Sequence, residues 1–163
     1  MVEHALSERR ERVFIILAGI FLCSMTLLNV IGITRFIQLG PLALAVGVLP
    51  YPLTFLCTDI ICELYGKSRA NFLVSVGLGL NFFILTVLYI GNTVPSVPAE
   101  SMPPWQILQL AAPVALPNGE IVSGSIGFYQ LIYATTSGAV FASMLAYITA
   151  QYCDVQLFHF WKR

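Results

Sequence analysis

The sequence predicts an all-α fold, a polytopic bundle of helices in a membrane. Hydrophobic residues make up 58% of the chain and charged residues only 10%, whereas soluble domains average about 25% charged residues. Four windows, 13–33, 42–65, 70–90 and 127–147, are apolar over the roughly 20 residues that a helix needs to cross a bilayer. We therefore expect a single integral membrane domain over 1–163, with about four transmembrane helices and an outer loop over about 92–125.

Positive charge predicts the orientation of these helices, because cytoplasmic loops are enriched in lysine and arginine. The basic residues precede the first window, separate the second from the third and follow the fourth; they are Arg9, Arg10, Arg12, Lys67, Arg69, Lys162 and Arg163. Arg35 is the exception, and 92–125 contains no lysine or arginine. Both termini are therefore expected in the cytoplasm, with 1–12 as a solvated tail.

Composition and motifs also exclude several classes of protein. The net charge is zero, which gives no electrostatic reason to bind nucleic acid. The chain has no phosphate-binding loop, no His/Cys spacing typical of metal ligands and no assignable Ser-His-Asp set. We expect neither enzyme activity nor a metal or other cofactor.

Two asparagines lie inside apolar windows. Asn29 is deep in the first window and Asn81 is near the centre of the third. An asparagine in a membrane helix usually bonds across to a neighbouring helix. A place on the wall of a cavity is the alternative for both.

Two prolines, Pro50 and Pro52, fall near the middle of the second window. Proline removes a backbone donor and clashes with the preceding turn, so this helix should be kinked or broken at mid-membrane. Non-helical backbone at that depth is tolerated where it is buried in protein or lines a watery cavity. Discontinuous helices form the substrate sites of many secondary transporters, and a plain packing kink is the alternative.

After the prolines, Phe55, Asp59 and Glu63 share one helical stripe. A charge inside hydrocarbon is costly, so an intramembrane carboxylate indicates a functional site. Glu63 has Lys67 one turn away, and either an ion pair with it or a functional role fits. Asp59 has no such cation nearby, which favours a role in holding a substrate or a proton.

The helical pattern of the fourth window continues beyond 147, through Gln151 and Asp154. A straight helix from Gly127 to Phe160 would be about 50 Å long, which exceeds a bilayer core. We expect its end to project into the cytoplasm or to bend, with Asp154 at a solvated helix end.

Several of these residues together resemble the queuosine precursor transporter family, also called the vitamin uptake transporters. The matching stretches are Asn29-Val30-Ile31-Gly32, Tyr51-Pro52-Leu53-Thr54-Phe55, Thr58-Asp59-Ile60-Ile61-Cys62-Glu63-Leu64-Tyr65-Gly66-Lys67, Ala142-Ser143 with Ala146-Tyr147, and Gln151 with Asp154-Val155 and Phe158. The resemblance covers most of the chain, and the central stretch is the specific part. It implies a multi-pass carrier of about six helices in the bacterial inner membrane.

The resemblance implies a cargo as well, the 7-cyano or 7-aminomethyl form of 7-deazaguanine. A carboxylate accepts the parallel N–H donors of a guanine-like edge bidentately, which makes Asp59 the first candidate for that role and Glu63 the second. The amides of Asn29, Asn81 and Gln151 could meet the remaining polar atoms. Tyr51 and Phe55 could stack on the base, with packing as their alternative role.

Other readings stay open at this stage. Family chains continue past the Lys-Arg end to a further hairpin, so the expectation for this chain includes a fragment of the transporter, a truncated product or half of a site completed elsewhere. A non-transporting accessory or scaffold subunit is the main alternative function, and an intramembrane enzyme ranks last. Membrane lipids and a second copy of the chain, as a homo-oligomer, are the expected partners besides the cargo.

Overall fold

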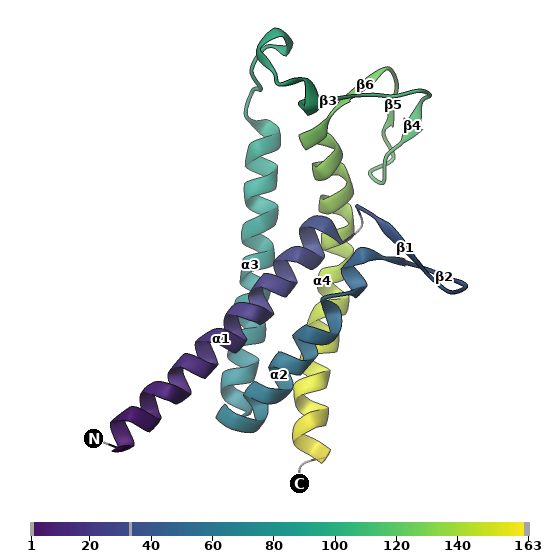
Figure 1. Ribbon diagram of the computed structural model, residues 1–163. Coiled ribbons are helices and arrows are strands. Elements are labelled where there is room, and N and C mark those ends of the chain that lie inside the picture. The colour runs from purple at the N-terminus through teal and green to yellow at the C-terminus, as the bar shows by residue number, and fades with distance from the viewer. Residues whose placement is uncertain (1, 33, 162–163) are drawn as a thin grey trace.

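The computed structural model confirms the helical membrane bundle. The structure describes residues 2–32 and 34–161, and only the backbone at positions 2–5, 99, 139, 141–143, 145, 147 and 159. Its long helices are α1 (Val2–Ile31), α2 (Tyr51–Tyr65), α3 (Lys67–Thr93) and α4 (Phe128–Trp161). Helix α1 runs obliquely across the bundle, while α3 and α4 stand side by side (Figure 1). Within the described residues, Leu6–Ile31, Val46–Tyr65 and Lys67–Thr93 are long and apolar enough to cross a membrane.

The predicted break in the second window is confirmed. The apolar run from Leu42 first forms strand β2 (Leu42–Ala45), which pairs antiparallel with β1 (Phe36–Leu39), and then the 3-10 helix η1 (Val46–Val48). Helix α2 begins at Tyr51, with Pro50 at its N-cap and Pro52 in its first turn. Proline is tolerated there because the first N–H groups of a helix have no partner within it. The first part of 42–65 is therefore a hairpin, not a helix.

Two helices extend beyond the windows that the sequence suggested. The segment 1–12, expected as a tail, is helical from Val2 onward as the first part of α1. Helix α4 contains 34 residues and so runs for roughly 51 Å at 1.5 Å per residue. Its continuation past 147 agrees with the stripe seen in the sequence.

Glycines permit two close connections in the bundle. Gly66 is the only residue between α2 and α3, and its φ of +85° is a conformation that other residues rarely adopt. The Gly47 amide donates to the Gly32 carbonyl at 3.0 Å, which holds η1 against the end of α1. A Cβ on Gly47 would lie 2.9 Å from the Cα of Gly32, so glycine is needed for this approach.

The segment between α3 and α4 lies at the end of the bundle opposite the two termini (Figure 1). It contains η2 (Ala99–Ser101), η3 (Pro104–Gln106) and two small antiparallel pairs, β3 (Ile107–Gln109) with β6 (Ser125–Gly127) and β4 (Val114–Ala115) with β5 (Ile121–Val122). Trp105 is exposed, as expected for a residue at a membrane interface.

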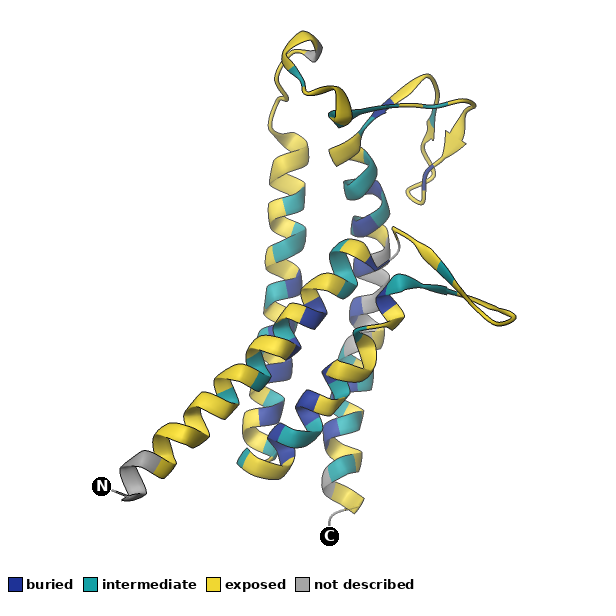
Figure 2. Ribbon diagram, in the orientation of Figure 1, coloured by how far each residue is buried: buried dark blue, intermediate teal, exposed yellow. Residues whose placement is uncertain are grey.

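The main core lies where all four long helices meet. Figure 2 shows the buried residues gathered there, whereas the outer part of α3 is mostly exposed. The buried members are Phe21 and Met25 of α1, Cys57, Ile61 and Cys62 of α2, Ala70, Leu73 and Val74 of α3, and Val155 of α4. The end of the bundle with the α2–α3 turn and the start of α1 carries Arg9, Arg10, Arg12, Lys67 and Arg69, and we call it the basic end.

Candidate functional site

The two intramembrane asparagines contact one another. The Asn29 amide nitrogen of α1 donates to the Asn81 amide oxygen of α3 at 2.5 Å. Asn81 is only 2% exposed and Asn29 is half-buried. The sequence left two roles open for these asparagines, a bond to a neighbouring helix or a place on a cavity wall. The structure shows the bond between helices.

Gln151 of α4 packs against the first turn of α2. It is 1% exposed, and its amide nitrogen donates to the Thr54 hydroxyl over a long 3.4 Å. Its amide oxygen is buried and has no hydrogen-bond partner among the described residues. Buried polar atoms are nearly always paired in folded proteins, which makes this acceptor a candidate for binding a donor group.

One turn further along α2, a second polar contact joins the same two helices. The Thr58 hydroxyl lies 3.2 Å from a carboxylate oxygen of Asp154 and 2.9 Å from the Phe55 carbonyl. A hydroxyl has one proton to donate, so these acceptors compete for it. Asp59, the next residue of α2, is half-buried. The structure therefore places one carboxylate, that of Asp154, at this contact and a second, that of Asp59, on the neighbouring residue of α2.

We call Thr54, Thr58, Asp59, Gln151 and Asp154 the α2–α4 polar contact. It carries two carboxylates and an amide oxygen that has no partner among the described residues. Two neighbouring carboxylates repel one another when both are charged, unless protons, a cation or N–H donors compensate for them. The arrangement is suited to a ligand that presents several N–H groups on one side.

The two aromatic residues predicted to stack on the base lie at the start of α2. The rings of Tyr51 and Phe55 contact each other, with centroids 5.4 Å apart and planes tilted by 55°. Both stand within one turn of Thr54 along α2.

Glu63 belongs to a different part of the molecule. It is exposed at the basic end and lines a pocket together with Arg9, Arg10 and Tyr65. Lys67, the cation one turn away, donates to the Gln156 side chain of α4. Asp59 and Glu63 thus share a stripe of α2 but have different surroundings.

A comparison with protein families decides what kind of protein holds this contact. A family model described as "Putative vitamin uptake transporter" matches residues 45–163. The chain belongs to this family. Searches of curated proteins and of solved structures gave no match.

The vitamin uptake transporter match includes α2, α3 and α4 and therefore every residue of the α2–α4 polar contact. Asn29 lies before it. No three His, Cys, Asp or Glu side chains lie close enough to hold a metal ion in the part of the chain that the structure describes.

Sequence reasoning singled out Asp59 and Gln151 but did not select Thr54, Thr58 or Asp154. Asp154 shares a helical stripe with Gln151, which was the available signal. Its expected place at a solvated helix end is wrong, because α4 packs against α2 down to this level and leaves Asp154 half-buried at Thr58.

Proposed function

We propose that this membrane transporter imports a 7-deazaguanine precursor of queuosine across the bacterial inner membrane, with the base held at the α2–α4 polar contact. The observation that supports the proposal is the excess of acceptors there, above all the buried Gln151 oxygen without a partner. Deazaguanine is rich in donors, since its ring N1–H and exocyclic amine project side by side. A carboxylate accepts such a pair in a strong bidentate arrangement.

Asp59 is assigned to the guanine-like edge and Asp154 to the substituent at position 7. The 7-aminomethyl group is an ammonium cation near neutral pH, and a second carboxylate stabilises it; the 7-cyano group is neutral and gains nothing from that charge. Tyr51 and Phe55 supply an aromatic wall at the start of α2. This assignment favours the aminomethyl form as cargo.

The break before α2 fits the same function. Helix α2 begins at Pro50 and Tyr51 after a hairpin and a 3-10 turn, so the backbone around 46–50 is not part of a continuous helix. In secondary transporters, helices interrupted within the membrane provide binding groups and allow one part of the bundle to move against another. Thr54 lies in the first turn after the break, next to Gln151.

Uptake of radiolabelled deazaguanine precursors tests the proposal in cells that lack their own carrier. The chain, an Asp59→Asn variant, a Glu63→Gln variant and an empty vector are compared, with membrane insertion confirmed for each. Each variant removes one carboxylate from the same stripe of α2. Uptake should be lost in Asp59→Asn and largely retained in Glu63→Gln, since Glu63 lies at the exposed basic end.

Two results would contradict the proposal. If the Asp59→Asn variant still takes up the precursor, the Asp59 carboxylate does not bind the base. No uptake by the inserted, unchanged chain, together with no binding of either base to the purified protein, would favour a non-transporting accessory subunit.

A further inference from the structure

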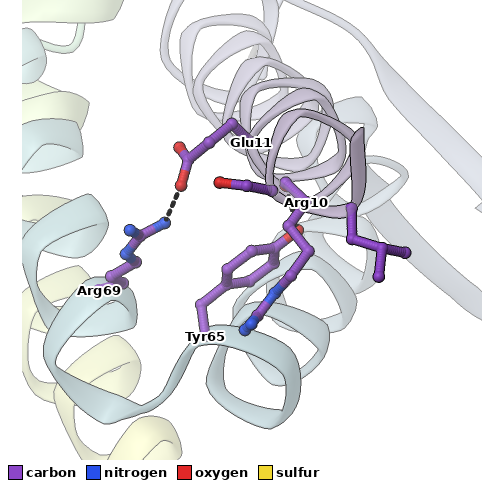
Figure 3. A pocket seen from close by; sticks show the side chains of 6 residues that line it. Arg10, Glu11, Tyr65 and Arg69 are labelled. Atoms are coloured by element: carbon purple, nitrogen blue, oxygen red, sulfur yellow. Dashed lines mark hydrogen bonds and ion pairs between the residues drawn. The ribbon is translucent and has the colours of Figure 1, made fainter. Parts of the chain in front are cut away.

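A pocket at the basic end lies in the wedge between the start of α1 and the α2–α3 turn. Its volume is about 540 Å³, and the described residues that line it are Leu6, Ser7, Arg10, Glu11, Tyr65 and Arg69. Figure 3 shows the Arg10 side chain beside the Tyr65 ring, with Arg69 and Glu11 on the other side. This pocket is separate from the α2–α4 polar contact, because none of its lining residues belongs to that contact.

Arg10 is fixed in place by α2. Its guanidinium donates to the Leu64 carbonyl at 2.9 Å and lies 5.6 Å from the centroid of the Tyr65 ring. The Tyr65 hydroxyl in turn donates to the Arg10 carbonyl at 2.5 Å. The bond to Leu64 occupies one of the five N–H donors of a guanidinium, so Arg10 is both positioned and able to bind an anion.

Arg69 faces the same ring from α3. Its guanidinium lies 5.6 Å from the Tyr65 centroid and 5.3 Å from that of Phe14, and it pairs with Glu11 at 3.0 Å. Glu11 offsets one positive charge, and the lining of two arginines and one glutamate keeps a net positive charge. The two guanidinium groups flank the Tyr65 ring, and the N–H donors of Arg10 that the Leu64 carbonyl leaves free can bind phosphate oxygens.

An apolar groove continues from this polar pocket. A second pocket of about 470 Å³ shares Leu6, Arg10 and Tyr65 with the first and extends along Val13 and Leu64, with the charged residues Arg9 and Glu63 also in its lining. Leu6, Val13 and Leu64 are all exposed large hydrophobic residues. Leu6 starts the stretch of α1 that is apolar enough to cross a membrane, and the candidate span Val46–Tyr65 ends at the same groove, so the groove lies at the ends of two candidate spans.

We propose that these joined pockets bind an anionic phospholipid from the leaflet at the basic end. Its phosphate binds the free N–H donors of Arg10, and one acyl chain follows Leu6, Val13 and Leu64. Basic pockets between membrane helices at this level bind anionic headgroups. A soluble phosphate would use Arg10 alone, whereas a phospholipid also covers the apolar groove. The site is independent of the cargo proposed above, and its occupant ties α1 to the α2–α3 turn.

Native mass spectrometry of the full chain tests the proposal. The purified protein is incubated in detergent micelles with added phosphatidylglycerol, phosphatidylcholine or inorganic phosphate. It is then released from the micelles, and the bound molecules are counted. Phosphatidylglycerol should be retained over phosphatidylcholine, and Arg10→Gln should weaken this retention about tenfold, the factor expected for a lost charge-assisted hydrogen bond. Arg12→Gln is the matched control, because Arg12 pairs with Glu8 on α1 at 3.8 Å and is 77% exposed.

A second pair of variants keeps the test valid if Arg10→Gln does not fold. Ser7→Asp adds a carboxylate to the pocket at an exposed position, and Ser68→Asp adds the same charge at an exposed position in the first turn of α3. Ser7→Asp should reduce retention of phosphatidylglycerol, and Ser68→Asp should not. If Arg12→Gln lost as much lipid as Arg10→Gln, and Ser68→Asp as much as Ser7→Asp, the retention would come from general charge attraction and the proposed site would be wrong. Retention of inorganic phosphate equal to that of the lipid would overturn the phospholipid as its occupant.

Discussion

Replacing Asn81 by alanine separates the two roles that the sequence leaves open for this residue. The structure gives Asn81 one bond to Asn29 across α1 and α3 at 2.5 Å, and the residue is 2% exposed. Alanine removes the acceptor and leaves the Asn29 amide in a half-buried place without this partner. We expect the change to destabilise the fold and to leave substrate recognition otherwise intact.

The size of the effect follows from the surroundings of the bond. Hydrogen bonds between membrane helices contribute about 0.6 kcal/mol on average and up to about 1.7 kcal/mol. A short bond at a nearly fully buried acceptor belongs in the upper part of that range, and the desolvated Asn29 donor adds to the loss. Asn81→Ala should therefore lower the free energy of unfolding by about 1–2 kcal/mol.

Unfolding by detergent titration in mixed micelles measures this free energy. The set includes Asn29→Ala, Asn81→Ala, the double variant and Asn71→Ala. Asn71 is the matched control on α3, since its side-chain oxygen is buried and has no hydrogen-bond partner among the described residues. The double variant should lose less than the sum of the single ones, with a coupling of about 1 kcal/mol.

Additive losses in the double variant would refute the structural role of the Asn29–Asn81 bond. An Asn81→Ala protein that keeps its stability but no longer takes up deazaguanine would refute it in another way, by assigning Asn81 to the substrate.

Further predictions concern the polar contact and the glycines. Gln151→Leu should change the unfolding free energy by at most about 1 kcal/mol, because the only hydrogen bond found for its amide among the described residues is long, yet uptake should fall about tenfold or more; a retained rate would exclude Gln151 from the site. Asp154→Asn should reduce uptake of the aminomethyl base more than that of the cyano base, and equal reductions in a competition assay would argue against a charge contact. Gly47→Ala should destabilise the protein by about 1–3 kcal/mol, since its Cβ would meet the Gly32 backbone. A Cβ at Gly19 would meet no atom within 4 Å, so Gly19→Ala should stabilise α1 by about 0.5–1 kcal/mol. Equal thermal unfolding temperatures for the Gly47→Ala and Gly19→Ala proteins would contradict the close approach of Gly47 to Gly32.

Much of the architecture was predictable because its causes are local. Apolar length predicts helices that can cross a membrane, and proline chemistry predicts the interruption before α2. The position of Asp59 within an apolar window marked it as a candidate without any knowledge of its neighbours. The hairpin formed by β1 and β2 was not foreseen, because an apolar run alone does not distinguish a strand from a helix.

The partners of these residues were not predictable in the same way. Asn29 and Asn81 are 52 positions apart, and Thr58 and Asp154 are 96 apart. Their contacts depend on which faces of the helices meet and on how the helices are shifted along one another. Helical periodicity gives the face of one helix but not the face that packs against it.

The sequence by itself determined the membrane class of this protein, the break at Pro50 and the stripe that carries Asp59 and Glu63, since each follows from neighbouring residues along the chain. The tertiary structure alone decided that Thr58, next to Asp59, contacts Asp154 of α4 and that Glu63 lines a pocket with Arg9 and Arg10 at the basic end. The physical reason is that one turn of α2 contacts α4, whereas the next opens toward the start of α1. Two carboxylates four residues apart therefore have different neighbours.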